Sequence, residues 1–412
     1  MAYVDSGINL IEEAEKEYSH IYKRIDEIAY YNQKKVLEAF RKNRIAERHL
    51  KGSSGYGYGD IGRDSLCHVY ADVFKTEAAL VSPLIANGTH ALTIGLFALL
   101  RSGEALYSVT GEPYDTLMGV INGESGSLKE YGIGYYQSDL NGSGGFKFDE
   151  IIDTINTHSE IKVVYVTRSR GYTSRKALKV TDLGALIAYV KERVDRKLYF
   201  VVDNCYGEFT QENEPSEFGA DLTIGSLIKN IGGGLAPTGG YLVGTVEAVE
   251  KAAFRLTAPG LGNEVGSYMY GYQNYYEGLF LAPHIVANAL KGSVLIGAVM
   301  KKCGYHPIPE PEEEMNDIIR SIVFNDENDL IKFIQTIQKY SPIDSDVLPE
   351  PWDMPGYNEK VIMAAGSFVG GASIELSADA PIKPPYIAYV QGGLTYEHVK
   401  IALEGILSEL KK

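Results

Sequence analysis

Short apolar runs alternate with helical patterns between residues 60 and 255, and this alternation constrains the fold of the chain more than any other feature. The runs 161–166 and 198–202 are rich in β-branched and aromatic residues, whereas residues 89–100 and 181–194 have helical patterns. Strands that alternate with helices predict βαβ units and a largely parallel sheet covered on both faces. The other expected elements of this part are strands at 78–81, 105–109 and 241–243 and a helix at 60–74. We therefore expect an α/β domain built on a mainly parallel mixed sheet covered by helices.

The segments on either side of this part have different patterns. Residues 9–46 have apolar side chains at steps of three and four, which predicts one long amphipathic helix. After about residue 285 the pattern is that of a smaller α+β domain, with helices at 284–301, 328–340 and 395–410 and strands near 361–364, 372–376 and 386–390. We therefore expect an N-terminal helical arm and loop (1–59), a large domain (60–284) and a small domain (285–412).

Composition and charge exclude several classes of protein. The 412 residues include 39 Lys and Arg against 54 Asp and Glu, and the resulting net charge of −15 would repel a nucleic-acid backbone. The three cysteines form no CxxC pair and the histidines have no metal-ligand spacing, so we expect neither disulfides nor a metal site. The chain starts without a signal-peptide pattern, and its longest apolar stretches, such as 91–100, break too early to span a bilayer. We therefore expect a cytoplasmic protein that binds neither nucleic acid nor membrane.

The segment Gly57-x-Gly59-x-x-Gly62 has the spacing of a dinucleotide-binding motif. Such a motif must follow a buried strand within a βαβ unit, and the preceding residues RIAERHLKGSS do not form a strand pattern. We therefore expect a flexible loop at 53–64 rather than a nicotinamide site.

Three other features favour a binding site at one edge of the predicted sheet. Gly88 and Thr89 open an apolar helix, where free N–H groups bind phosphate well, although Thr89 would equally serve as an ordinary helix cap. Asp203 ends a buried strand, where ligands of open α/β sheets collect, but it would also cap the next turn. Lys229 lies between an apolar strand and a glycine run; it is either a surface lysine or, if buried, one that loses its proton easily.

The order of these features favours pyridoxal phosphate as a cofactor. Its phosphate needs a helix terminus, its ring nitrogen a carboxylate and its aldehyde a lysine. Tyr114 follows the strand at 105–109 and would stack on the ring, the alternative being simple packing.

The sequence as a whole resembles the pyridoxal-phosphate-dependent enzymes of the aspartate aminotransferase fold (fold type I). More closely, it is similar to a bacterial family of methionine γ-lyase-like and cystathionine β-lyase "aluminium resistance" proteins. The matching blocks extend over nearly the whole chain, at 55–64, 87–91, 108–117, 201–209, 225–244, 256–266 and 389–398.

The resemblance implies roles for particular residues. Lys229 would form a Schiff base with the cofactor, Asp203 would pair with the pyridine nitrogen and Tyr114 would stack on the ring. The residues that would hold the phosphate are Gly88, Thr89 and Ser226. Tyr56 or Tyr58, together with Arg63, would reach the phosphate from a neighbouring subunit, which implies a homodimer or homotetramer with the active site at the subunit interface.

The residue that would bind the substrate carboxylate is open. The related family has arginine where this chain has Lys383, and a lysine lacks the bidentate fork of an arginine. Arg168 and Arg170, which follow the strand at 161–166, are the other candidates for the carboxylate or for a cofactor oxygen.

The resemblance implies a lyase that breaks a carbon–sulfur bond in an amino acid, of the cystathionine β-lyase or methionine γ-lyase type. Three alternatives within enzymes use the same residues: an aminotransferase, a racemase and an aldolase-type enzyme. A regulatory protein that binds pyridoxal phosphate with little turnover is the alternative outside catalysis.

Overall fold

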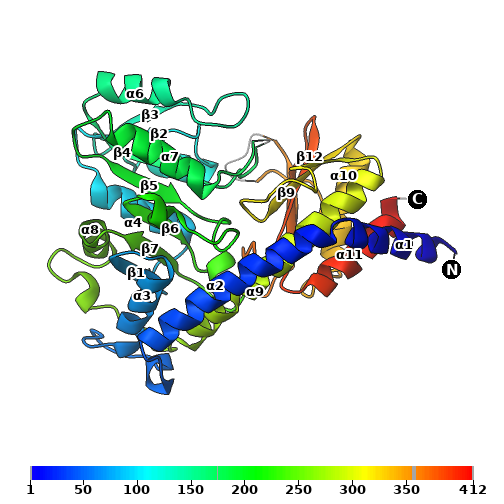
Figure 1. Ribbon diagram of the computed structural model, residues 1–412, viewed down its shortest axis with the longest axis horizontal. Coiled ribbons are helices and arrows are strands. Elements are labelled where there is room, and N and C mark those ends of the chain that lie inside the picture. Colours follow the sequence, from blue (N-terminus) through cyan, green and yellow to red (C-terminus); the bar gives the residue numbers. More distant parts are fainter. Residues whose placement is uncertain (1, 174, 355–358, 411–412) are drawn as a thin grey trace.

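The computed structural model describes residues 2–173, 175–354 and 359–410, which form a large domain, a small domain and two long helices that join them (Figure 1). The two long helices are α2 (Ser19–Lys42) and α9 (Gln273–Lys302), which pack along each other. The expected single helix over 9–46 is wrong, because the helix is interrupted at Tyr18, which separates α1 (Ala2–Glu17) from α2. This interruption lets α1 run in a different direction from α2, so that Ile11 and Ala14 of α1 are buried at the small domain.

The large domain has a seven-stranded sheet with the order β1-β7-β6-β5-β4-β2-β3. Its strands are β1 (Ala78–Ser82), β2 (Ala105–Ser108), β3 (Gly134–Gln137), β4 (Ile161–Thr167), β5 (Tyr199–Asp203), β6 (Leu222–Ser226) and β7 (Gly240–Gly244). Strands β3, β2, β4, β5 and β6 run parallel, and only β7 runs antiparallel to its two neighbours. The predicted α/β class with a mainly parallel mixed sheet is confirmed.

Helices cover both faces of this sheet because successive strand residues point to opposite sides. On β7, Leu242 packs in the cluster under α4 (Gly88–Leu99) and α8 (Val246–Leu256), whereas Tyr241 and Val243 pack on the opposite face. The remaining helices of this domain are α3 (Ile61–Val73), α5 (Asp115–Asn122), α6 (Phe148–Thr157) and α7 (Val180–Lys191).

The small domain has a five-stranded antiparallel sheet with the order β10-β11-β12-β9-β8. The elements are β8 (His306–Ile308), β9 (Ile319–Phe324), α10 (Glu327–Lys339), β10 (Val361–Ala364), β11 (Ser377–Pro381), β12 (Tyr386–Gln391) and α11 (Tyr396–Leu410). The strand expected at 372–376 is wrong, because these residues belong to a loop and the strand begins at Ser377. The buried Glu375 carboxylate holds this loop by accepting hydrogen bonds from the N–H groups of Phe368 and Val369, both at 2.9 Å.

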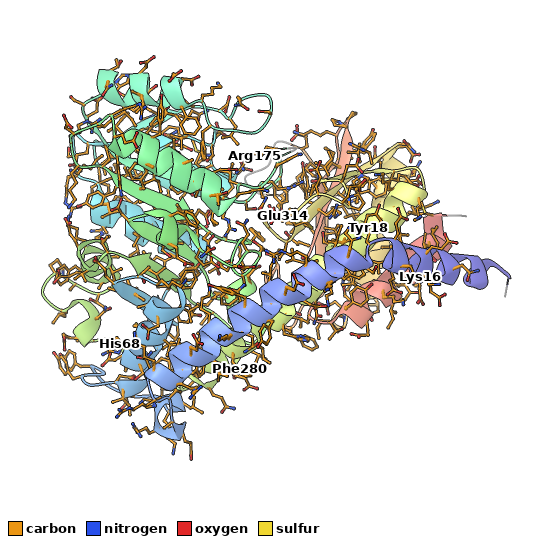
Figure 2. The ribbon with its side chains drawn as sticks, in the orientation of Figure 1. Lys16, Tyr18, His68, Arg175, Phe280 and Glu314 are labelled. Carbon is orange, nitrogen blue, oxygen red and sulfur yellow. The ribbon has the colours of Figure 1, made fainter. Side chains whose placement is uncertain are left out.

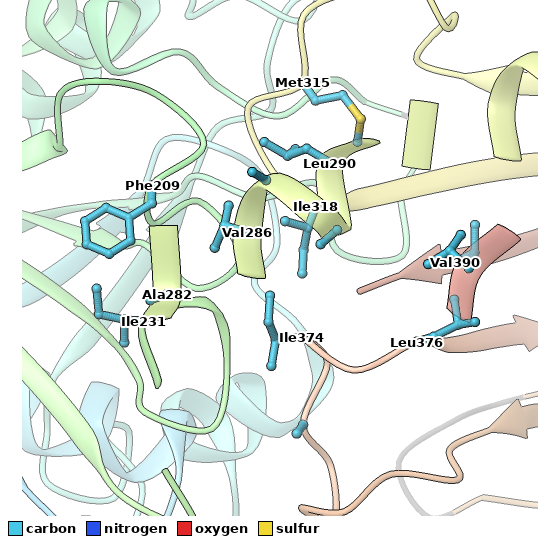
Figure 3. Packing of buried hydrophobic residues seen from close by; sticks show 14 of the residues in the cluster. Phe209, Ile231, Ala282, Val286, Leu290, Met315, Ile318, Ile374, Leu376 and Val390 are labelled. Carbon is cyan, nitrogen blue, oxygen red and sulfur yellow. The ribbon is translucent and has the colours of Figure 1, made fainter. Parts of the chain in front are cut away.

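Helix α9 belongs to the hydrophobic core of both domains. Figure 3 shows Ala282, Val286 and Leu290 of this helix between large-domain residues such as Ile231 and small-domain residues such as Ile374. The expected domain boundary at 284 therefore falls inside one continuous helix. By length and composition α9 could cross a membrane, contrary to the expectation that the apolar stretches are too short. However, 67% of its apolar window is buried inside the protein, as in a core helix.

Candidate active site

The start of α4 lies against the carboxyl ends of β5 and β6. A Cβ atom at Gly88 would lie 3.4 Å from Cβ of Ser226 and 3.5 Å from Sγ of Cys205, so the start of α4 packs against the side chains of both residues. Asn87 caps the helix by accepting a hydrogen bond from the N–H of His90 at 2.8 Å. The N–H groups of Gly88 and Thr89 precede the first intrahelical bond of α4, and they carry the positive end of the helix dipole.

The Ser226 hydroxyl is the second polar group at this point. Its side chain is 1% exposed, and its Oγ atom has no hydrogen-bond partner among the described residues. A buried hydroxyl without a partner costs free energy, and most such groups in folded proteins are satisfied. A phosphate group at the start of α4 would satisfy Ser226 and the free N–H groups together, so these residues fit the phosphate of the predicted cofactor.

Asp203 supplies the negative charge of the site from the last position of β5. Its Oδ1 accepts a hydrogen bond from the N–H of Cys205 (3.1 Å), and its Oδ2 accepts one from the hydroxyl of Tyr165 (3.4 Å). Burial raises the pKa of the Asp203 carboxyl, while the Lys229 ammonium opposes this shift. A buried carboxyl with a raised pKa is suited to pair with a protonated ring nitrogen, as a cofactor would offer.

Lys229 follows β6 and extends toward the same group of residues. Its Nζ atom lies 3.9 Å from the ring centroid of Tyr206. The expectation that Lys229, if buried, loses its proton easily is wrong for the chain alone. Burial does lower this pKa. The acidic groups around the amine, among them Cys205, Tyr206 and Asp203, have a larger and opposite effect and raise the pKa well above its usual value.

Tyr114 reaches the start of α4 from the position before α5. Its hydroxyl and the Oγ1 atom of Thr89 are 3.2 Å apart, and Thr89 Oγ1 is also 3.1 Å from Oγ1 of Thr116. Burial and the Asp203 carboxylate raise the pKa of the Tyr114 hydroxyl, which therefore keeps its proton. The structure thus brings together Gly88, Thr89, Tyr114, Asp203, Ser226 and Lys229 as the sequence predicted, whereas the cofactor-binding roles of these residues stay predictions.

The loop with the dinucleotide-like spacing has no strand before it and packs on residues 266–267 instead. Nη1 of Arg63 donates to the carbonyl oxygens of Gly57 (3.1 Å) and Gly266 (3.3 Å). The rings of Tyr56 and Tyr58 stack with centroids 5.5 Å apart, and these side chains are 70% and 64% exposed. Within the subunit, the described contacts of these tyrosines do not include Lys229 or Ser226. They are therefore free to contact a neighbouring molecule.

Two of the three candidates for a substrate carboxylate have other partners. Lys383 forms an exposed ion pair with Glu359 at 2.9 Å. Arg168 is fully buried and donates through Nε, Nη1 and Nη2 to five acceptors: Leu178 O, Asn204 Oδ1, Gly207 O, Thr210 Oγ1 and Gln211 Oε1. Because a guanidinium has five N–H groups, the prediction of Arg168 as a carboxylate ligand is wrong.

Arg170 lies where the two domains meet. Its Nη1 donates to the carbonyl oxygen of Ile308 at 2.6 Å, and its Nε is 3.8 Å from Oδ2 of Asp317 in the small domain. Its Nε makes no hydrogen bond among the described residues. Arg170 is therefore the one of the three predicted candidates that lies at this edge of the sheet with a donor to spare.

Three residues of this region, Arg175, Tyr206 and Ser373, were not predicted from the sequence. Figure 2 shows Arg175 on the side of the large domain that faces the small domain. Its Nη2 donates to the carbonyl oxygens of Thr167 (2.7 Å) and Ser169, and burial lowers its pKa to about 10. The cluster of arginines at 168–175 was a signal for Arg175. No pattern in the sequence indicated that Tyr206 contacts both Lys229 and Ser373 of the small domain.

Comparison with known proteins gives consistent matches. A family model described as methionine gamma-lyase matches residues 7–411. The uncharacterised protein YnbB of Bacillus subtilis (strain 168) is 49% identical over 395 residues, which cover 95% of this chain and 93% of YnbB. The solved structure of a carbon–sulfur lyase involved in aluminium resistance from Clostridium novyi NT is 51% identical. It covers 99% of this chain and 97% of that chain, with a TM-score of 0.94.

A more distant match concerns the fold alone. A cystathionine gamma synthase from Xanthomonas oryzae pv. oryzae is 16% identical, with a TM-score of 0.61 over 93% of this chain and 98% of that chain. The fold is therefore that of the fold-type-I pyridoxal-phosphate-dependent enzymes, as the resemblance implied.

Proposed function

Because the chain belongs to the methionine γ-lyase family, we propose that it is a pyridoxal-phosphate-dependent lyase that breaks a carbon–sulfur bond in an amino acid. The observation that carries this proposal is the meeting of three parts: the start of α4 with the unsatisfied Ser226 hydroxyl, the buried Asp203 carboxyl and the Lys229 amine. The description of the C. novyi structure as a carbon–sulfur lyase supports the reaction class.

The residues present would hold the cofactor from three sides. Gly88, Thr89 and Ser226 would bind the phosphate, Asp203 would pair with the ring nitrogen, and Lys229 would bind the aldehyde carbon. When bound, pyridoxal phosphate supplies an electron sink for negative charge that develops at the substrate α-carbon. Asp203 would strengthen this sink by favouring a proton on the ring nitrogen.

The proton transfers would then fall to two side chains of this chain. The Lys229 amine would accept the proton from the substrate α-carbon, since it is the basic group of the site. The Tyr114 hydroxyl, which keeps its proton and is oriented by Thr89, would donate to the departing sulfur or orient the substrate. After the sulfur group is lost as a thiol, hydrolysis by one water molecule would release ammonia and a keto acid, the water supplying the keto oxygen.

We also propose that the protein is a homodimer or homotetramer whose subunits complete each other's sites. The loop with the exposed Tyr56 and Tyr58 packs on the segment that carries the exposed side chains of Met269 and Tyr270. Exposed apolar clusters of this kind mark interaction sites. In such an assembly these tyrosines would reach the phosphate in the neighbouring subunit.

A substrate panel tests the proposed reaction. Purified protein loaded with pyridoxal phosphate is incubated with cysteine, cystathionine, methionine and homocysteine, and thiol, keto acid and ammonia are assayed together. The proposal predicts equal amounts of all three products from at least one substrate, and none from Lys229→Ala. Keto acid without ammonia would instead indicate an aminotransferase, and bound cofactor without turnover on the whole panel would indicate a regulatory protein; either result contradicts the proposal.

A further inference from the structure

Tyr206 has a backbone conformation that a bulky residue rarely adopts. Its φ of +71° lies in the left-handed region, which costs free energy for a side chain of this size. Two hydrogen bonds to residues elsewhere in the chain hold this conformation. Nδ2 of Asn230 donates to the Tyr206 carbonyl oxygen at 3.0 Å, and Oγ of Ser373 donates to the Tyr206 hydroxyl at 3.2 Å. A strained conformation that is fixed from both ends suggests a functional reason for the position of the ring.

The result of this conformation is that the Tyr206 ring faces the Lys229 amine. The distance of 3.9 Å from Nζ to the ring centroid is within the range of a cation–π interaction, which is strongest where water is excluded. The other groups that act on the amine are acidic: Asp203 from β5, Cys205 from the loop after it and Tyr114 from the start of α5. The Tyr206 hydroxyl acts in the same direction as these groups. The Tyr206 ring face differs, because it attracts a cation but has no lone pair that accepts the proton.

We propose that Tyr206 is a positioning residue that holds the protonated amine of Lys229, and that Ser373 ties its ring to the small domain. This inference rests on the proposed function. When Lys229 takes the proton from the substrate, the α C–H bond breaks, an N–H bond forms, and the electron pair stays with the carbon. The Tyr206 ring then keeps the ammonium beside the reacting atoms until it gives up the proton, without competing for that proton.

The test measures the Lys229 amine in the full chain freed of cofactor. Acetic anhydride acetylates only the unprotonated amine, and mass spectrometry of the Lys229 peptide across a pH series gives the midpoint of its protonation. For Tyr206→Leu we expect this midpoint to fall by about one pH unit, because the cation loses a favourable contact. For Tyr206→Phe, which keeps the ring face and loses only the hydroxyl, we expect a clearly smaller fall than for Tyr206→Leu. A wild-type midpoint in Tyr206→Leu would overturn the proposal.

Two further variants guard against a merely structural effect. Phe209→Leu is the matched control, since Phe209 also has a left-handed φ (+60°) and its ring faces a different lysine, Lys35, at 5.4 Å. It should destabilise the fold without moving the Lys229 midpoint. If Tyr206→Leu does not fold, Tyr206→Gly removes the ring while accepting the positive φ, and the same fall in midpoint is expected.

The same preparations separate this inference from the proposed function. If wild-type protein does not bind pyridoxal phosphate, the proposed function fails, although the acetylation result still reports on the Tyr206 contact. If the cofactor binds but the midpoint of Tyr206→Leu equals that of the wild type, only the positioning role of Tyr206 is contradicted. The same conclusion follows from Tyr206→Gly where the leucine variant does not fold. In the loaded enzyme, Ser373→Ala and Tyr206→Phe should lower kcat by similar factors, and their effects should not add, because both remove one hydrogen bond.

Discussion

At the scale of single residues, the site combines groups that are unfavourable for the chain alone. Ser226 buries a hydroxyl without a partner, and Asp203 buries a carboxyl whose pKa is raised by desolvation. Both are costs that a bound phosphorylated ring would remove, since it brings oxygens to the hydroxyl and a ring nitrogen to the carboxyl. Residues that destabilise the free protein in this way are typical of binding sites.

Replacing Ser226 with alanine should therefore separate stability from cofactor binding. We expect Ser226→Ala to leave the unfolding free energy of the cofactor-free protein unchanged or raised by up to ~1 kcal/mol, because an unsatisfied hydroxyl is lost. Its dissociation constant for pyridoxal phosphate should rise about tenfold, as expected for one lost hydrogen bond to a charged group. Urea unfolding and titration of the cofactor absorbance measure the two effects.

Ser321 provides the matched control for this prediction. It is 0% exposed on β9, and its Oγ atom likewise has no partner among the described residues. Ser321→Ala should change stability as Ser226→Ala does but leave cofactor affinity at the wild-type value. Equal affinities in the two variants would contradict the assignment of Ser226 to the phosphate.

The residues of the site were predictable to different degrees. Lys229, Asp203 and the start of α4 could be found because sheet topology brings the ends of parallel strands together, whatever the side chains around them. The hydrogen bonds of Arg168 could not be predicted, since its five acceptors come from two separate segments, Leu178 and 204–211, that meet only in the fold. The direction of the Lys229 pKa shift could not be predicted either, because it depends on the neighbouring acidic groups and not on burial alone.

At the scale of elements, β11 and the loop after β4 link the two domains beside the site. The hydroxyl of Tyr172, in this loop, donates to Oδ2 of Asp379 on β11 at 2.9 Å, and the Tyr389 hydroxyl donates to the Tyr172 carbonyl oxygen at 2.9 Å. Burial raises the pKa of the Asp379 carboxyl to about 6, and the bond from Tyr172 opposes the shift. This contact between the domains therefore includes a group that titrates near neutral pH.

The raised pKa of Asp379 predicts a definite pH dependence of stability. The folded protein holds the proton more tightly than the unfolded chain does, so this contribution is fully present below about pH 4 and is lost as the pH rises through about 6. In the Asp379→Asn variant, the side chain at this position is uncharged at every pH in this range. Relative to wild type, the variant should gain ~2 kcal/mol of unfolding free energy between pH 4 and pH 7, measured by urea unfolding across that range. A constant difference at every pH would contradict this assignment.

The element boundaries that sequence patterns missed have tertiary causes. Apolar periodicity continues through Tyr18, because both α1 and α2 bury one face against α9, although α1 also packs on α11 and α2 also packs on α3. The apolar run at 372–376 resembles a strand, but the Glu375 carboxylate satisfies loop N–H groups that a strand would pair along its edge. Periodicity reports burial, and it does not report which element provides the partner.

At the scale of the whole molecule, the two domains meet at the site itself. Ser373 contacts Tyr206, Asp317 accepts a hydrogen bond from the Ser169 hydroxyl at 3.2 Å, and α9 runs through the hydrophobic cluster shared by both domains. A shared core of this kind makes large independent domain motion costly. The proposal that a neighbouring subunit completes the site assigns this role to the exposed Tyr56 and Tyr58.

Complementation between inactive variants tests the shared site. One subunit carries Lys229→Ala, and the other carries Tyr56→Ala and Tyr58→Ala; each variant alone should be nearly inactive. If the tyrosines act across the interface, a mixed dimer has one intact site, and co-expression should restore about a quarter of the wild-type activity. If they act within their own subunit, no mixed dimer has an intact site, and activity stays at the background of the separate variants.

The central claim, that Lys229 binds pyridoxal phosphate at this site, is tested most directly by reductive mapping. Protein loaded with the cofactor is treated with borohydride, digested and analysed by mass spectrometry. We expect a phosphopyridoxyl group on the Lys229 peptide and none on Lys35. Lys35 is a buried lysine outside the site, and its Nζ donates to the Glu212 carbonyl oxygen at 3.2 Å. A modification on another lysine, or an unmodified Lys229, would contradict it.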